Sequence, residues 1–258
     1  MNEILNQRGE AFSNKVLDYV QYRPSYPQEA IDFLVTEKIL TQQQIIAEIG
    51  HGTGKLTEVL LNNSLQVVGI EPNDEMRDLS TQLFATNSNF QAHKGFSENT
   101  NFQAHSIDII IAANALHWFD ITPTLQEFQR IVKPNTHKNL IAIWNKKNKE
   151  DNFTNEYIAI ADTNKINNLY ANSEEDYDVL FQKFIGNTNS YEKYIFRNVH
   201  TLDLEAMLGR YDSISHRYEK NTLEYATIIQ EFKKLYRTYQ VDGKVNLLYD
   251  CTIYIATI

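Results

Sequence analysis

The sequence has little cysteine, little proline and no long apolar run. Of its 258 residues only Cys251 is cysteine, and five are proline. A single cysteine excludes an intramolecular disulfide and a zinc site built from several cysteines. A chain of this length can bury a sizeable core without such cross-links. We therefore expect a fold stabilised by its hydrophobic core, without a bound metal.

We expect neither a membrane-spanning nor a secretory segment. The longest apolar candidate, Ile107 to Leu116, is interrupted by Asp108 and Asn114 and is shorter than the roughly 18 residues of a membrane-spanning helix. The first ten residues, MNEILNQRGE, contain no basic stretch followed by an apolar one, which a secretory signal would require. We expect a cytoplasmic protein without membrane association.

Basic residues are outnumbered by acidic ones. Lys and Arg total 24 and Asp and Glu total 33, which gives a formal net charge of −9. Binding to nucleic acid depends on clustered basic side chains that neutralise phosphates. The charge balance therefore disfavours a nucleic-acid partner, whereas the oligomeric state cannot be inferred from the sequence.

Five short apolar runs before residue 150 alternate with helical patterns. The run before the first glycine-rich turn is β-branched, and the fourth is almost continuously apolar, as in a central strand that is covered on both faces. Strands that alternate with helices pair in parallel through crossover connections. The order therefore predicts a doubly wound, Rossmann-like α/β sheet. The predicted strands are Ile45–Ile49, Leu65–Ile70, Phe90–Gly95, Ile107–Ala112 and Leu140–Trp144. Helices are predicted at 27–40 and 122–132, and a further helix, which contains Met76, Leu79 and Leu83, is predicted to be capped by Asp74.

The pattern changes after Asn145. Residues 146–200 are polar and rich in asparagine, with a helical stretch at 177–185, and are interpreted as a helical cap. Helices are predicted at 202–208 and 223–239. Two closing strands, 243–249 and 252–258, are separated by two residues and predict an antiparallel hairpin. We expect a single domain over 1–258 with a seven-stranded, mostly parallel sheet: an N-terminal lid and first helix (1–40), a nucleotide-binding core (41–145), the cap (146–200) and closing elements (201–258).

The turn at Gly50–Gly54 reads GHGTG and lies between a strand and a helix. Glycines at alternate positions allow positive φ and close approach of a ligand to the backbone. The following helix presents its free amides to that ligand. A dinucleotide fingerprint requires a third glycine at position 55, which is lysine, and the spacing does not match a phosphate-binding P-loop.

Two acidic residues end the first two predicted strands. Glu71 follows the last glycine of the turn by 17 residues, at the tip of the neighbouring strand, where a carboxylate can accept hydrogen bonds from two ribose hydroxyls. Glu48 lies near the tip of the first strand and would favour a ligand with a cationic group and repel a pyrophosphate. An adenosine-containing cation is the predicted ligand.

Three segments carry a resemblance to a known family: residues 47–54 (AEIGHGTG), 68–76 (VGIEPNDEM) and 107–119 (IDIIIAANALHWF). Together they resemble class I S-adenosylmethionine-dependent methyltransferases, and most of all the type 11 methyltransferase-domain proteins that act on small molecules. Residues 22–27 (YRPSYP) and the closing strands are similar as well. Two residues depart from the family pattern, because Glu48 replaces the commoner aspartate and His51 replaces a small residue.

The resemblance implies S-adenosyl-L-methionine as cofactor, S-adenosyl-L-homocysteine as product and a small molecule as methyl acceptor. The three glycines would contact the methionyl and ribose portions, Glu48 the amino group, Glu71 the ribose hydroxyls, and Met76 the adenine. Tyr22 and Arg23 would belong to an N-terminal lid together with Tyr19 and Tyr26, with Arg23 bound to the methionine carboxylate. The implied cofactor-binding residues are Tyr22, Arg23, Glu48, Gly50, His51, Gly52, Thr53, Gly54, Glu71, Pro72, Met76, Ser97, Glu98 and Asn114.

Methyl transfer from a sulfonium requires mainly positioning and the exclusion of water, and a base only for some acceptors. His117 is the first candidate for that base, because it follows the fourth strand at the ligand-binding edge of the sheet. Tyr26 and His216 are weaker candidates. Two alternatives stay open at this point: a non-catalytic protein that binds the same cofactor, and a nicotinamide-dependent dehydrogenase, which the glycine spacing and Glu48 disfavour.

Overall fold

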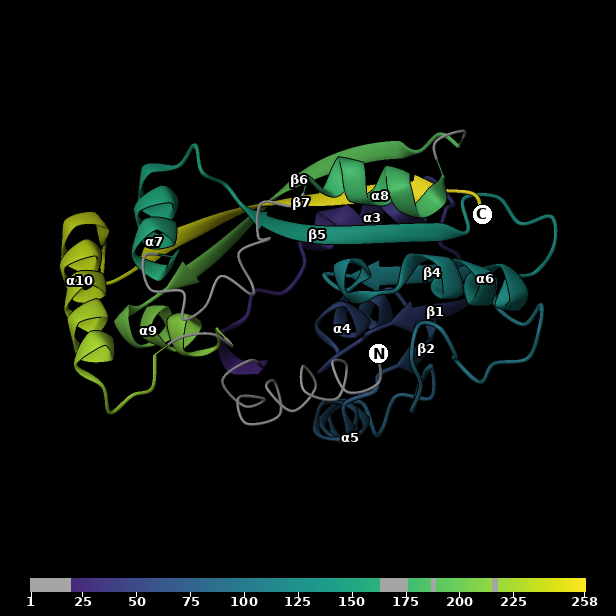
Figure 1. Ribbon diagram of the computed structural model, residues 1–258, viewed down its shortest axis with the longest axis horizontal. Coiled ribbons are helices and arrows are strands. Elements are labelled where there is room, and N and C mark those ends of the chain that lie inside the picture. The colour runs from purple at the N-terminus through teal and green to yellow at the C-terminus, as the bar shows by residue number, and fades with distance from the viewer. Residues whose placement is uncertain (1–19, 163–175, 187–188, 215–217) are drawn as a thin grey trace. The chain divides into compact units, whose positions relative to one another are not determined.

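The computed structural model describes residues 20–162, 176–186, 189–214 and 218–258. Its seven-stranded sheet has the order β3-β2-β1-β4-β5-β7-β6 (Figure 1). The strands comprise β1 (Ile45–Ile49), β2 (Gln66–Ile70), β3 (Phe90–His93), β4 (Ile109–Ala113), β5 (Leu140–Lys147), β6 (Glu192–Leu202) and β7 (Val245–Ala256). The pairs β1–β2, β1–β4, β2–β3 and β4–β5 are parallel, and β6 and β7 form the C-terminal antiparallel pair. The predicted doubly wound, mostly parallel sheet is confirmed.

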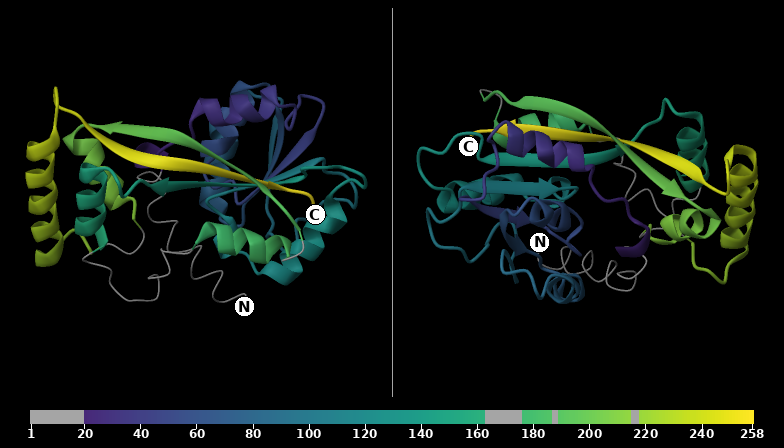
Figure 2. Two further views of the ribbon diagram at one scale, coloured as in Figure 1. Left: turned by 90° about the horizontal axis from the view of Figure 1, so that it is seen from above. Right: turned by 180° about the vertical axis from the view of Figure 1, so that it is seen from behind.

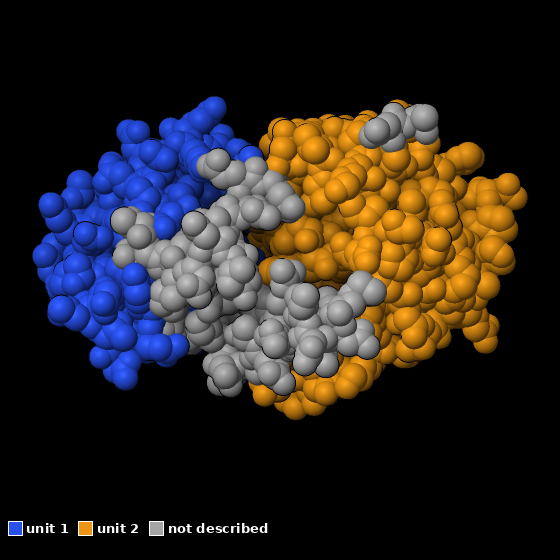
Figure 3. Space-filling model, viewed as in Figure 1, with its two compact units in different colours: residues 1–24, 146–175, 197–250 blue, residues 25–145, 176–196, 251–258 orange. Residues whose placement is uncertain are grey.

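The chain divides into two compact units, coloured separately in Figure 3. Unit 1 contains residues 1–24, 146–175 and 197–250, and unit 2 contains residues 25–145, 176–196 and 251–258. The change of pattern predicted after Asn145 coincides with a boundary between the units. The predicted cap over 146–200 is divided between them. The prediction of a single domain stays a prediction.

Unit 2 contains the parallel part of the sheet, and successive residues of each strand alternate between its two faces. In β4, Ile109 and Ile111 pack in one core with helices α3 (Gln28–Thr36) and α4 (Lys55–Asn62). Ile110 and Ala112 pack in the opposite core with α6 (Ile121–Ile131) and α8 (Tyr177–Ile185). A strand that is buried on both faces needs apolar residues at every position, which explains the continuous apolar run in this part of the sequence.

Unit 1 has a core of its own. Helices α7 (Asn152–Asp162), α9 (Leu204–Asp212) and α10 (Leu223–Tyr239) contribute to it together with the first half of β7. Its largest buried side chains are aromatic, and Tyr157, Tyr211, Phe232 and Tyr249 are each at most 2% exposed. Helix α10 has the bounds that the sequence pattern predicted.

Three predictions about secondary structure are wrong. Residues 243–258 do not form a hairpin, because β7 continues through Asp250 and Cys251 as one strand, beside β6 in both views of Figure 2. Asp250 is accommodated within the strand by a hydrogen bond from Asn148 (2.9 Å) and by Arg197 at 3.7 Å. Residues 192–200 of the predicted helical cap belong to strand β6.

The third correction concerns the start of α5 (Asp74–Leu83). Asn73, rather than Asp74, caps this helix, because its Oδ1 accepts a hydrogen bond from the amide of Met76 at 2.9 Å. Among the described residues, no helix combines the length and apolar character that crossing a membrane requires.

Candidate functional site

The candidate site lies at the carboxyl ends of β1, β2 and β4 in unit 2. In the sheet, β2 and β3 lie on one side of β1, whereas β4 and β5 lie on its other side. In open α/β sheets this reversal of strand order opens a crevice at the strand ends, where ligands bind. The glycine turn follows β1 directly, Glu71 follows β2 and Asn114 follows β4. The topology thus brings the central part of the predicted site together.

The three glycines of the turn have positive φ values of 72°, 57° and 88°. A Cβ at Gly50 would lie 2.9 Å from the Cβ of Ala115, and one at Gly54 would lie 2.4 Å from the ring of Phe84. These two glycines are therefore required for packing within the protein. At Gly52 the nearest atom to such a Cβ is the Met76 sulfur at 3.9 Å. Gly52 is thus the glycine at which a ligand can approach the backbone, with Met76 beside it.

Glu71 is buried beside the glycine turn and accepts two backbone hydrogen bonds. Its Oε2 accepts from the amide of Gly52 and its Oε1 from the amide of Asn73, both at 2.9 Å. Burial raises the pKa of the Glu71 carboxyl, although these two amides and the charge of Arg77 oppose the increase. Each carboxylate oxygen can accept a further hydrogen bond. The side chain is therefore fixed in place and still able to accept from a diol.

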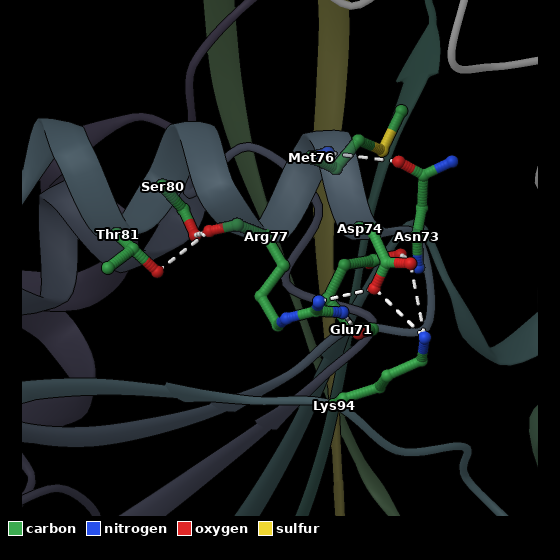
Figure 4. Close-up of polar contacts among 8 residues, drawn as sticks. All are labelled: Glu71, Asn73, Asp74, Met76, Arg77, Ser80, Thr81 and Lys94. Carbon is green, nitrogen blue, oxygen red and sulfur yellow. Dashed lines mark hydrogen bonds and ion pairs between the residues drawn. The ribbon is translucent and has the colours of Figure 1, made fainter.

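Three charged residues surround the segment that holds Glu71 (Figure 4). Arg77 donates from Nη1 to the carbonyl oxygen of Glu71 at 3.0 Å and pairs through Nη2 with Asp74. Asp74 also pairs with Lys94 at 3.0 Å. Arg77 was not among the predicted site residues, although a basic residue in the first turn of a helix after an acidic strand end is a recognisable signal. These contacts fix the path of the chain between β2 and α5.

Glu48 is almost fully buried in β1, with 1% of its surface exposed. Its Oε2 accepts a hydrogen bond from the Thr57 hydroxyl at 2.6 Å. Burial raises the pKa of Glu48 to about 8; the hydrogen bond from Thr57 opposes this increase and the charge of Glu71 adds to it. The carboxyl is consequently neutral at pH 7 unless a cation approaches it. Thr57 lies in the first turn of α4, and sequence reasoning missed it because its contact with β1 is tertiary.

The two side chains between the glycines have different surroundings. The His51 ring packs over Gly69 of β2, where an added Cβ would lie 2.4 Å from it, and edge-to-face against Phe90 of β3. Burial and the nearby Arg77 lower the pKa of His51 to about 4, so the ring is neutral. We therefore attribute a packing role to this ring. The hydroxyl of Thr53 is buried and has no hydrogen-bond partner in the described parts of the chain.

A polar network follows the ends of β4 and β5. Asn114 donates from Nδ2 to the Tyr26 hydroxyl at 2.8 Å and accepts at Oδ1 from the amide of Asn145 at 3.2 Å. Asn145 donates in turn to the carbonyl oxygen of Ser25 at 3.2 Å. Asn114 itself has a positive φ of 48°, which asparagine tolerates better than most residues. The structure thus brings Tyr26 and Asn114 together, and it adds Asn145, which the sequence did not indicate.

His117 lies in the short 3-10 helix Leu116–Trp118, and its ring lies near the rings of Trp118 and Tyr177. Its Nδ1 accepts a long hydrogen bond, 3.4 Å, from the indole nitrogen of Trp144. Trp144 stacks on Tyr177 with ring centroids 4.5 Å apart. An imidazole that accepts at Nδ1 carries its proton on Nε2 in the neutral form. This tautomer makes His117 a hydrogen-bond donor rather than a base at Nε2.

The remaining predicted residues are distributed over both units. Ser97 accepts from Thr124 at 3.0 Å, and Glu98 accepts from the amide of Asp120 at 3.3 Å, so the segment after β3 that holds both residues contacts the start of α6. Pro72 is exposed directly after Glu71.

Only part of the predicted N-terminal lid belongs to unit 2. Tyr22 packs against Gly209, and Arg23 donates to the carbonyl oxygen of Ser213 at 3.0 Å, so both belong to unit 1. Tyr19 and His216 lie outside the described residues. The described residues contain no group of three or more His, Cys, Asp or Glu side chains that could hold a metal ion.

The central segment of the chain matches a known protein family. The family model described as "Methyltransferase domain" matches residues 47–138, which include the glycine turn, Glu71 and His117. Residues 47–138 are thus similar to a methyltransferase domain. The resemblance seen in the sequence motifs is thereby confirmed.

Curated relatives of this chain are also named as methyltransferases. An uncharacterized methyltransferase of Mycobacterium tuberculosis is 34% identical over 135 residues, which are 52% of this chain and 52% of the relative. A probable S-adenosylmethionine-dependent methyltransferase of Saccharomyces cerevisiae is 26% identical over 131 residues, 48% of this chain and 44% of the relative. The chain thus matches about half the length of these relatives.

Solved structures show the same fold. A putative type II methyltransferase from Anaeromyxobacter dehalogenans superimposes with a TM-score of 0.60 at 18% identity, covering 91% of this chain and 97% of that one. The likeness extends beyond the segment that the family model matches.

Proposed function

We propose that this protein transfers the methyl group of S-adenosyl-L-methionine to a small-molecule acceptor. The observation that carries the proposal is a pair of buried carboxyl groups, Glu48 and Glu71, at the carboxyl ends of adjacent strands beside the glycine turn. Two acidic groups in this position disfavour the pyrophosphate of a dinucleotide and favour a ligand that carries positive charge. S-adenosyl-L-methionine carries a sulfonium and an ammonium group.

The residues present fit this cofactor. Glu71 offers two fixed oxygens for the ribose hydroxyls, and Gly52 leaves room for the ligand next to Met76. When the Glu48 carboxyl ionises, it can neutralise the ammonium group of the cofactor. The buried Thr53 hydroxyl can form a hydrogen bond with the ligand. The contacts of Pro72, Ser97, Glu98, Tyr22 and Arg23 with the cofactor stay predictions.

The bound cofactor supplies an activated methyl group on its sulfonium, so the protein has to position the acceptor and exclude water. Tyr26, held by Asn114, can donate or accept a hydrogen bond at the end of β4. His117, whose Nδ1 accepts from Trp144, can donate a hydrogen bond from Nε2 to an oxygen of the methyl acceptor. This hydrogen bond would orient a lone pair of that oxygen. We therefore propose that His117 and Tyr26 act on the acceptor, with His117 as a donor.

Calorimetric titration of the full chain with S-adenosyl-L-methionine, S-adenosyl-L-homocysteine and NAD tests the cofactor. The proposal requires binding of the first two and weak or no binding of NAD. Tight binding of NAD without binding of S-adenosyl-L-methionine would overturn it. Glu75→Gln, on the exposed first turn of α5, is a matched control for variants of Glu71.

Turnover distinguishes an enzyme from a protein that only binds the cofactor. Release of S-adenosyl-L-homocysteine in the presence of a panel of small alcohols, amines, thiols and acids supports the enzyme. Cofactor binding without release for any acceptor supports the non-catalytic alternative. The cytoplasmic location stays part of the proposal.

A further inference from the structure

Thr57 is a polar residue on the buried face of α4. A buried hydroxyl has to be hydrogen-bonded to offset the cost of its desolvation. A threonine in a helix can meet this need locally, on the carbonyl oxygen one turn earlier. Thr81 of α5 and Thr227 of α10 do so, at 2.8 and 2.9 Å. The other buried side chains of α4 are apolar: Leu56, Val59, Leu60 and Leu61.

The hydroxyl of Thr57 instead forms its hydrogen bond outside the helix. It donates to Oε2 of Glu48 at 2.6 Å, and the two residues are 0% and 1% exposed. In the sheet, Glu48 lies between Gly69 of β2 and Ile111 of β4, and neither neighbour has a polar side chain. The described residues thus give the Glu48 carboxyl one hydrogen bond, which leaves Oε1 to accept from a ligand.

The surroundings of Glu48 favour its neutral form, and Thr57 opposes them. Burial raises the pKa of Glu48, and the negative charge of Glu71 at the end of β2 raises it further. The His51 ring over Gly69 is neutral, because burial lowers its pKa to about 4, and so offers no positive charge. The Thr57 hydroxyl lowers the pKa of Glu48, because a donated hydrogen bond stabilises the ionised carboxylate. Thr57 therefore reduces the cost of ionising Glu48 when a cationic ligand binds.

We propose that Thr57 is a positioning residue that prepares Glu48 to bind the ammonium group of the cofactor. By holding Oε2, the hydroxyl fixes the Glu48 carboxyl before the ligand arrives and leaves Oε1 for the ammonium group. A side chain that is fixed in advance loses less conformational freedom on binding. This role rests on the proposed function, because it belongs to the same site. It requires the site to recognise the ammonium group as well as the adenosine part of the ligand.

Two ligands separate this role from a general effect on the site. S-adenosyl-L-homocysteine carries the ammonium group, whereas 5′-methylthioadenosine has the same adenosine and thioether sulfur without the amino-acid tail. In calorimetric titration of the full chain at pH 6.5, Thr57→Val should weaken binding of S-adenosyl-L-homocysteine about tenfold. Binding of 5′-methylthioadenosine should change by less than about twofold, because this ligand does not need ionised Glu48. Equal weakening of both ligands, or no weakening of either, would overturn the inference.

The pH dependence of binding is a second readout, which a merely structural role of Thr57 would not change. At pH 8.5 the wild-type carboxyl is largely ionised before the ligand binds, because burial raises the pKa of Glu48 to about 8. The tenfold difference between wild type and Thr57→Val for S-adenosyl-L-homocysteine should therefore fall to about threefold or less at pH 8.5. A difference of the same size at both pH values would contradict the proposed role.

Two further variants serve as controls. Thr57→Ser keeps the hydroxyl and should bind both ligands within about threefold of the wild type. Thr100→Val is a matched control, because the buried Thr100 hydroxyl also donates to a carboxylate, that of Glu127, at 2.6 Å. This variant should leave the ratio of the two affinities as it is in the wild type. A change of that ratio as large as in Thr57→Val would show that any buried threonine–glutamate bond has the effect, and would overturn the inference.

Failure of this role and failure of the proposed function give different results. If the wild type binds neither S-adenosyl-L-methionine nor S-adenosyl-L-homocysteine, the proposed function fails and the role of Thr57 fails with it. If the wild type binds S-adenosyl-L-homocysteine and Thr57→Val binds it equally well, the role of Thr57 alone is refuted.

Discussion

Glu48 is the residue whose protonation most sharply distinguishes the proposed cofactor from other ligands. Burial raises its pKa from 4.5 to about 8, so the carboxyl in the ligand-free protein is about 97% protonated at pH 6.5. An ammonium group that binds beside Glu48 would ionise it, because an adjacent cation stabilises the carboxylate. We therefore predict that binding of S-adenosyl-L-methionine at pH 6.5 releases about one proton.

Calorimetry in buffers of different ionisation enthalpy measures this proton directly. The slope of the observed enthalpy against the buffer enthalpy should correspond to about one proton for the wild type and to nearly none for Glu48→Gln. The glutamine keeps an oxygen that can accept from Thr57 and has no titratable group. Glu58→Gln, on the exposed side of α4, is the control and should behave as the wild type does. Binding without proton release by the wild type would refute the ionisation of Glu48.

The same pKa has a consequence for stability. A carboxyl whose pKa is higher in the folded state than in the unfolded state holds its extra proton between the two values. Its contribution to the free energy of unfolding is therefore greatest below pH 4.5 and is lost as the pH rises through about 8. With these values, the contribution falls by a few kcal/mol between pH 5 and pH 8. The difference in the free energy of unfolding between the wild type and Glu48→Gln, measured by urea unfolding at a series of pH values, should show this fall. The same pH dependence in both proteins would refute the assignment.

Three further predictions concern single residues of the site. Glu71→Gln should weaken binding of S-adenosyl-L-methionine by about 1–3 kcal/mol in calorimetry, since hydrogen bonds to a charged acceptor are lost, and unchanged affinity relative to Glu75→Gln would exclude Glu71 from the site. His117→Gln, which can still donate, should retain more turnover than His117→Ala once an acceptor is known; equal loss in both would favour a base instead. Gly50→Ala should lower the free energy of unfolding by about 1–3 kcal/mol more than Gly186→Ala, because both have positive φ and only Gly50 would clash, with the Cβ of Ala115. Equal destabilisation by the two alanines would show that φ alone accounts for the effect.

The parts of the fold that could be predicted are those where a local pattern coincides with burial. Strand β4 is apolar at every position because both of its faces are covered, and α10 has a clear amphipathic pattern between its capping Thr222 and its end. The glycine turn was recognisable because Gly50 and Gly54 are required by packing as well as by backbone conformation. In these segments local and tertiary requirements agree.

Strands β6 and β7 were mispredicted for physical reasons. Strand β6 alternates exposed and more buried residues, and its charged residues Lys193 and Arg197 lie at exposed positions, so its sequence resembles a surface segment. Strand β7 contains Asp250 at a position that resembles a turn, and only the contacts from Asn148 and Arg197 allow it to continue. Partners that are distant in sequence decided both outcomes.

The candidate site shows the same division. The positions of Glu48, Glu71 and Asn114 at strand ends followed from the order of the elements. The orientation of the His51 ring over Gly69, the hydrogen bond from Thr57 to Glu48 and the tautomer that Trp144 imposes on His117 depend on tertiary contacts. A sequence pattern indicates which residues approach the ligand, whereas these contacts determine what each residue can do.

A crystal structure of the full chain with S-adenosyl-L-homocysteine would test the central claim most directly. We predict that the two ribose hydroxyls lie within hydrogen-bond distance of the Glu71 carboxylate, about 2.5–3.0 Å, with the backbone of Gly52 against the ligand and its amino group on the side of Glu48. A ligand bound away from the glycine turn, or with its ribose hydroxyls on residues other than Glu71, would contradict the account.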